Sequence, residues 1–162
     1  MSKNISLCLI IICFFFACVQ QSNTTEIVFQ KEATLKIINS AEQEIIFDVE
    51  LANTDYKRER GLMYRRNMAE NQGMFFDFPH SEIRSFWMKN TYLSLDLIFI
   101  DEHWNIVDIH ENAFPLREDP ILSKEPAKYV FEVLGGICQK MHIGVGDRVV
   151  LFLGQQPMHD RD

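Results

Sequence analysis

Short apolar runs separated by turn-forming residues constrain this chain more than any other feature of its sequence. The clearest run is Ile45–Ala52, where apolar and polar side chains alternate with a period of two, as in a half-buried strand. Leu93–Ile100 is strongly apolar and predicts a central strand. Further strands are expected over residues 35–38, 74–78, 85–88, 106–110, 129–134 and 148–153.

Two short helical segments interrupt this pattern. Thr54 or Asp55 can cap a helix over Tyr56–Met63, and Ile137–His142 is long enough for one helical turn. Asn112–Lys124 contains two prolines and predicts a long surface loop. We therefore expect a mostly β (α+β) fold, a small barrel or sandwich of about seven or eight short strands with one or two short helices, rather than alternating βαβ layers.

The N-terminal segment predicts export and a lipid anchor. Lys3 precedes an apolar run over Ile5–Ala17, which has the length of a signal-peptide core and is too short to span a bilayer comfortably. Ala17 followed by Cys18 resembles the processing site of bacterial lipoproteins. That resemblance implies cleavage after Ala17 and lipidation of Cys18, which would anchor the exported chain to the inner or outer membrane of the cell envelope. An uncleaved anchor and ordinary secretion are the alternatives.

These features divide the chain into four expected parts: a signal peptide over 1–17, a lipidated cysteine with a flexible tether over 18–30, a globular domain over 31–154 and a polar tail over 155–162. Three of the four cysteines lie in or at the end of the signal. Only Cys138 remains in the domain, so no internal disulfide is expected, and an inert buried thiol is the favoured interpretation.

The charge balance excludes two classes of partner. The chain has 23 acidic and 16 basic residues and a formal net charge of −7. Sequence-independent nucleic-acid binding depends on clustered Lys and Arg, and adhesion to anionic lipid depends on a basic patch. We therefore expect no nucleic-acid partner, and membrane attachment only through the N-terminal lipid.

Several blocks of the domain carry a family resemblance. They are Arg60–Met63, Gly73–Phe76, Phe86–Thr91, Leu95–Asp96, Pro115, Glu132 and Gly146–Asp147. In this order they resemble the prokaryotic family called domain of unknown function 192, over about Ile45–Phe152. The resemblance implies a small, mostly β domain, often with an N-terminal signal or anchor. It implies no reaction, because the family is named for lacking one.

The block around Trp87 is the first candidate site. On a strand, Trp87 and Lys89 would share one face. Together with Asn90 they could stack on a flat or sugar-like ring and hydrogen-bond its polar edge. The structural alternative makes Trp87 a core residue and Asn90 part of a turn.

Asp96 is the second candidate, because a carboxylate inside an apolar strand needs a partner. Lys89, Arg60 and Arg84 could supply one. A buried salt bridge or a set of backbone hydrogen bonds is the structural interpretation. A carboxylate of perturbed pKa acting as an acid or base is the functional one.

Four arginines surround Gly61–Met63 in this acidic chain, at positions 58, 60, 65 and 66. Arg58 and Arg65 would share a helix face by their seven-residue spacing. One arginine could clamp a carboxylate or phosphate, whereas a solvated basic face that pairs with nearby acids is the structural interpretation. The methionines and histidines have no ligand spacing, and no nucleotide or nucleophile motif occurs, so no metal and no cofactor is expected.

The sequence thus favours a non-enzymatic module that binds a small molecule, a carbohydrate or an anion, at the cell envelope. Its expected site residues are Arg60, Trp87, Lys89, Asn90, Asp96 and Glu132. One alternative is a hydrolase that uses Asp96 as acid or base and Lys89 as an electrostatic stabiliser. The other is a structural or assembly lipoprotein that docks a protein partner through a surface patch.

Overall fold

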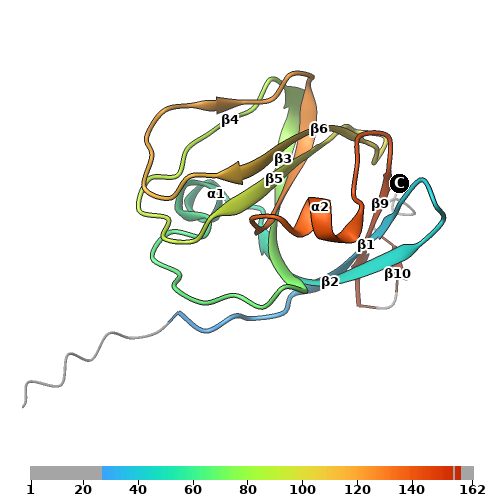
Figure 1. Cartoon of the computed structure of the whole chain (residues 1–162), viewed down its shortest axis with the longest axis horizontal. Coiled ribbons are helices and arrows are strands. Elements are labelled where there is room, and N and C mark those ends of the chain that lie inside the picture. The colour runs from blue at the N-terminus through green and yellow to red at the C-terminus, as the bar shows by residue number, and fades with distance from the viewer. Residues whose placement is uncertain (1–26, 155, 158–162) are drawn as a thin grey trace, which may run out of the picture.

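The computed structural model describes residues 27–154 and 156–157 (Figure 1). The expected signal peptide, Cys18, most of the tether and most of the polar tail lie outside the described residues. Ten strands and two helices follow in chain order: β1 (Ala33–Ile38), β2 (Glu44–Ala52), α1 (Asp55–Arg60), β3 (Gln72–Glu82), β4 (Ser85–Phe86), β5 (Leu95–Ile100), β6 (Ile106–Ala113), β7 (Ile121–Leu122), β8 (Ala127–Leu134), α2 (Ile137–Met141), β9 (Arg148–Leu153) and β10 (Gln156–Pro157).

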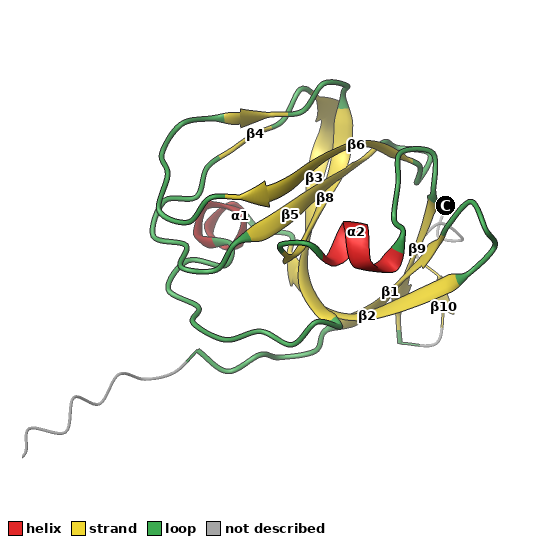
Figure 2. Cartoon of the chain, viewed as in Figure 1, coloured by secondary structure: helices red, strands yellow, loops and turns green. Residues whose placement is uncertain are grey.

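Eight of the strands form one curved sheet, in the order β10-β9-β1-β2-β3-β8-β5-β6 (Figure 2). All neighbours in this sheet are antiparallel except β2 and β3, which run parallel and are joined through α1. The parallel pair needs a crossover, and the crossover carries the helix. β4 and β7 form a separate two-stranded pair.

The mostly β (α+β) fold class is confirmed, with ten strands because three two-residue strands join the longer ones. The sheet is not closed, so a barrel is not supported, and the arrangement fits a sandwich. The expected loop over Asn112–Lys124 contains β7. A two-residue strand leaves too short an apolar run for the period-two pattern to reveal it.

Each face of the sheet packs against its own apolar cluster. Phe75, Ile98 and Phe131 point to the face covered by α2, where Ile137 and Cys138 join the cluster. Their chain neighbours point to the opposite face, where Leu62 and Met88 close a second cluster beside α1. The sheet contributes Phe76 of β3, Val130 of β8, and Leu97 and Phe99 of β5 to this second cluster. Because strand side chains alternate, one residue decides which cluster a side chain joins.

The helices agree with the sequence in position but not in length. Thr54 caps α1, with its Oγ1 accepting a hydrogen bond from the Lys57 N–H at 3.3 Å. The helix ends at Arg60 rather than at Met63, because Gly61 adopts a positive φ of 47°. Within residues 27–154 and 156–157, no helix is long and apolar enough to cross a membrane.

Candidate functional site

Two segments meet on the α1 face of the sheet. One is α1 with the turn that follows it, and the other is the segment after β4. The Tyr64 N–H donates to the Asn90 carbonyl at 2.8 Å, and the Asn90 amide nitrogen donates to the Tyr64 hydroxyl at 2.9 Å. Both residues have a positive φ, of 66° and 54°. This reciprocal pair holds the two segments together and fixes the turn around Asn90.

A hollow of about 360 Å³ opens between these segments. We call it the aromatic hollow. Its lining residues are Tyr56, Glu59, Arg60, Met63, Tyr64, Trp87, Lys89 and Asn90. Three aromatic side chains face it while remaining open to solvent, with Trp87 44% exposed. Exposed aromatic groups that gather at a concave site are typical of ligand binding.

Polar groups of the aromatic hollow are held close to its rings. The Lys89 ammonium lies 5.0 Å from the centroid of the Trp87 ring. The strand expected over residues 85–88 covers only Ser85–Phe86, so this contact comes from the turn after β4 and not from a shared strand face. The Arg60 guanidinium donates to the Tyr56 hydroxyl at 3.1 Å. The hollow therefore offers hydrogen-bond donors around a platform of rings, which suits a ligand with a flat apolar face and a polar edge.

A second hollow of about 260 Å³ adjoins the first. We call it the inner hollow. It is lined by Arg58, Glu59, Arg60, Met63, Phe76, Phe78, Ser85, Phe86, Trp87, Thr91 and Glu132. Glu59, Arg60, Met63 and Trp87 line both hollows, so Trp87 stands on the boundary between them.

Glu132 is the unusual group of the inner hollow. It lies on β8 inside the sheet, between Met74 of β3 and Leu97 of β5, and is 5% exposed. Its Oε2 atom has no hydrogen-bond partner among the described residues. Burial away from water raises the pKa of this carboxyl from 4.5 to about 8, so Glu132 is mostly protonated at neutral pH.

Asp96 does not lie at the site, so the expectation that it belongs there was wrong. The register of the sheet explains its position. Asp96 pairs with Val133, whereas its neighbour Leu97 pairs with Glu132, so Asp96 and Glu132 point to opposite faces. The Asp96 side chain is fully buried and lines neither hollow.

The partners expected for Asp96 were wrong. No arginine or lysine of the described chain is recorded in a salt bridge with it; three backbone N–H groups donate to its carboxylate instead. They belong to Asn112 at 2.8 Å, Gly136 at 3.0 Å and Cys138 at 2.9 Å. Asp96 thus ties the end of β6 and the β8–α2 turn to β5, which supports the structural interpretation. The pairing of Asp96 with Lys89 that a hydrolase would need is not formed.

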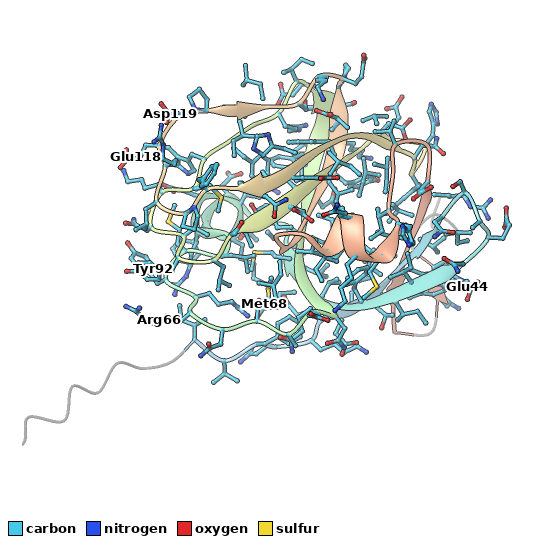
Figure 3. All side chains as sticks on the ribbon, in the orientation of Figure 1. Glu44, Arg66, Met68, Tyr92, Glu118 and Asp119 are labelled. Carbon is cyan, nitrogen blue, oxygen red and sulfur yellow. The ribbon has the colours of Figure 1, made fainter. Side chains whose placement is uncertain are left out.

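The arginines fit the expected basic face paired with acids in part: Arg60 and Arg66 are exposed, and Arg58 pairs with an acid, but Arg65 is buried. Arg65 is 4% exposed and bonds Glu50 at 2.5 Å, because α1 ends before it and turns it inward. Arg58 bonds Asp55 at 2.6 Å. Arg66 lies 4.5 Å from the centroid of the Tyr92 ring (Figure 3). Of the four arginines, Arg60 alone lines both the aromatic and the inner hollow.

Four residues that line the aromatic hollow were not among the expected site residues: Tyr56, Glu59, Met63 and Tyr64. A signal for the first existed, because Tyr56, Arg60 and Met63 have the spacing of one helix face. Tyr64 owes its place to the turn after α1, which no periodic pattern encodes. Cys138 is fully buried, and burial raises the pKa of its thiol further above the usual range, as an inert thiol requires. Among the described residues no group of three or more His, Cys, Asp or Glu could hold a metal ion.

A family model matches residues 36–151, most of the sheet and both hollows. The model is DUF192, whose description is "Uncharacterized ACR". The chain belongs to this family. The DUF192 chain is also 32% identical over 106 residues to a UPF0127 protein of Thermococcus sibiricus, a match that covers 62% of this chain and 64% of that protein's length.

Two solved structures resemble the DUF192 chain closely. One is a Sinorhizobium meliloti 1021 protein, named as a proposed transcription regulator, with a TM-score of 0.72 and 42% identity over 76% of this chain and 95% of that one. The other is a protein of unknown function from Novosphingobium aromaticivorans DSM 12444, with a TM-score of 0.69 and 31% identity over 72% of this chain and 82% of that one. The family has no assigned activity, so the two hollows provide the information about function.

Proposed function

We propose that this chain is an exported, lipid-anchored module that binds a carbohydrate in the aromatic hollow. The single observation that supports it most is the meeting of Tyr56, Tyr64 and Trp87 with Arg60, Lys89 and Asn90 around one concavity. A sugar ring has apolar C–H faces and a rim of hydroxyl groups. Its face would stack on the Trp87 ring. Its rim would accept hydrogen bonds from the Arg60 and Lys89 side chains and donate one to the Asn90 amide oxygen, because the Asn90 amide nitrogen already donates to Tyr64 and Met63.

The exposure of these rings favours binding over a purely structural role. Trp87, Tyr56 and Tyr64 are 44%, 68% and 51% exposed, so much of their surface stays in contact with water in the free domain. Covering such surface with a ligand releases hydrophobic free energy at about 25 cal/mol per Å². The Tyr64–Asn90 hydrogen bonds hold part of the wall in place, which lowers the entropic cost of binding.

An anion is the competing ligand class, because Arg60 and Lys89 are both cationic. Glu59 lines the same hollow and opposes that charge. The third class, docking of a protein partner, would use exposed apolar residues outside both hollows, such as Phe114, Leu116 and Leu122.

Replacing Trp87 with alanine tests the proposal. We expect the Trp87→Ala variant to bind its carbohydrate about 10- to 100-fold more weakly, because it loses the stacking platform of a binding hot spot. A glycan array with wild type would supply the ligand, and isothermal titration calorimetry would measure the loss. Phe114→Ala is the matched control, since Phe114 is a 79% exposed aromatic residue outside both hollows. Equal affinities of Trp87→Ala and wild type would contradict the proposed site, and wild-type binding of inorganic anions without sugars would favour the anion class.

The envelope location is tested separately at Cys18. We expect the Cys18→Ser variant to leave the membrane fraction, because one acyl-bearing cysteine supplies the whole attachment of an acidic chain. Fractionation of cells with metabolic acyl labelling measures this. An unlabelled wild type together with a membrane-bound Cys18→Ser variant would contradict the lipid anchor.

A further inference from the structure

Among the residues that the structure describes, none forms a hydrogen bond with the Glu132 Oε2 atom. Glu132 lies on β8, between the neighbouring strands β3 and β5, and its side chain reaches the inner hollow. Taking a carboxyl group out of water without a hydrogen-bond partner is costly, and a glutamine or leucine would fit a central strand at lower cost. Glu132 is 95% buried and faces a hollow, so its carboxyl group is placed to pair with a polar group of a bound ligand.

The walls of the inner hollow favour a cation as that group. Phe76, Phe78, Phe86 and Trp87 line the hollow together with Glu132. The Phe78 ring already has two guanidinium groups over it, with Arg58 5.4 Å and Arg84 3.9 Å from its centroid. The faces of aromatic rings attract cations, and so does a carboxylate. Arg58 does not fill this role, because its guanidinium donates to the Asp55 carboxylate and to the Asp77 carbonyl, each at 2.6 Å.

Gly61 leaves space beside the Glu132 carboxyl group, on the side of a neighbouring hollow of about 290 Å³ that Gly61 lines. A Cβ atom at Gly61 would lie 3.3 Å from the Phe76 ring and 3.8 Å from the Glu132 Oε2 atom. Any side chain there would occupy the space beside the carboxyl group. Trp87 lines both hollows, so a ring stacked on it in the aromatic hollow would be next to this space.

We propose that the carbohydrate is an amino sugar whose free ammonium group enters the inner hollow and pairs with Glu132. This inference rests on the carbohydrate-binding function proposed above and names the sugar class. Trp87 stacks on the sugar ring, and Glu132 selects the amine. An N-acetylated sugar lacks the charge, and a hydroxyl in place of the amine lacks it too.

Binding has a proton balance that follows from the burial of Glu132. In the free domain the carboxyl group holds its proton at neutral pH, because its pKa is about 8. Pairing with an ammonium group favours the carboxylate, so the Glu132 proton leaves to the buffer as the amino sugar binds. At about pH 6, where the sugar amine still carries its proton, nearly one proton should be released per ligand. Affinity should rise from about pH 5 to about pH 7 and fall above about pH 8, where the amine loses its charge.

The experiment compares three soluble probes of equal length on the whole domain: a glucosamine oligomer, its N-acetylated counterpart and a glucose oligomer. Calorimetry in two buffers of different ionisation enthalpy gives affinity and proton release together. We expect wild type to prefer the glucosamine oligomer by about 10- to 100-fold, the worth of a hydrogen bond to a charged group. Glu132→Gln should lose that preference and the proton release but keep weak binding of the glucose oligomer. Glu118→Gln, on an exposed residue outside both hollows, is the control (Figure 3).

The outcomes separate the two proposals. Equal wild-type affinity for all three probes would overturn the amine selection and leave the carbohydrate site intact. If wild type binds none of the three probes but binds another glycan of the array, the amino-sugar inference is overturned and the carbohydrate site stands. A glucosamine preference that survives in Glu132→Gln would remove Glu132 as the partner. Should Glu132→Gln fail to fold, the proton release and the pH dependence of wild type decide, because binding without either contradicts the inference.

Discussion

Between about pH 5 and pH 9 the wild-type domain should lose several kcal/mol of unfolding free energy that a Glu132→Gln variant keeps. Burial raises the pKa of Glu132 from 4.5 to about 8 in the folded state. The folded domain therefore binds this proton more tightly than the unfolded chain, so stability falls as pH rises between the two pKa values. At about 1.4 kcal/mol per pKa unit the difference approaches about 5 kcal/mol, and it should level off above about pH 8.

Urea unfolding of both proteins over a series of pH values measures this effect. The other titrating groups, among them Asp77 with its raised pKa and Asp108 with its lowered pKa, are common to both proteins and cancel in the difference. Glu118→Gln should follow wild type at every pH, because Glu118 is exposed. Parallel curves for wild type and Glu132→Gln would show that Glu132 is ionised in the folded domain throughout, contrary to its buried, unpartnered position.

Asp96→Ala should cost the domain about 3–5 kcal/mol of unfolding free energy, the range found when one partner of a buried charged network is removed. The substitution leaves three backbone N–H groups, those of Asn112, Gly136 and Cys138, without their acceptor in the interior. Asp96→Asn should cost less, because an amide keeps one acceptor oxygen while its NH₂ group faces a donor.

The same substitutions decide whether Asp96 is structural or functional. At a urea concentration or temperature where the Asp96→Asn variant is folded, we expect its ligand affinity to equal that of wild type, since Asp96 lies on the face opposite the hollows. Glu118→Ala, a surface substitution, should change stability by less than about 0.5 kcal/mol. An Asp96→Ala variant as stable as wild type but without ligand binding would restore Asp96 to the site.

Local patterns in the sequence predicted most of the strands. The period-two run at Ile45–Ala52 became β2, and the apolar run that begins at Leu93 contains β5. The arrangement of these strands was not predictable, since the parallel pairing of β2 with β3 and the central position of β8 depend on contacts between distant segments. Period and turn residues carry no information about such pairings.

The candidate site was predicted in part, for a similar reason. Arg60, Trp87, Lys89 and Asn90 were expected together and line the aromatic hollow, while Glu132 lines the inner hollow beside it. Asp96 was expected with them but lies on the other face. Its chain neighbour Leu97 pairs with Glu132, and successive side chains of a strand point to opposite faces. Which face a strand residue occupies follows from the register of the whole sheet, which sequence spacing alone does not determine.

Ligand binding at Trp87 can be observed directly by NMR. The chain has two tryptophans, and the second, Trp104, is 9% exposed and lines a different hollow of about 460 Å³ beside β9. Their two indole N–H signals in a nitrogen-15 NMR spectrum therefore report on two distinct places. On titration with the glucosamine oligomer, or with any glycan selected by the array, the Trp87 signal should shift saturably while the Trp104 signal stays in place. Saturable binding that moves the Trp104 signal and leaves the Trp87 signal unchanged would contradict the account.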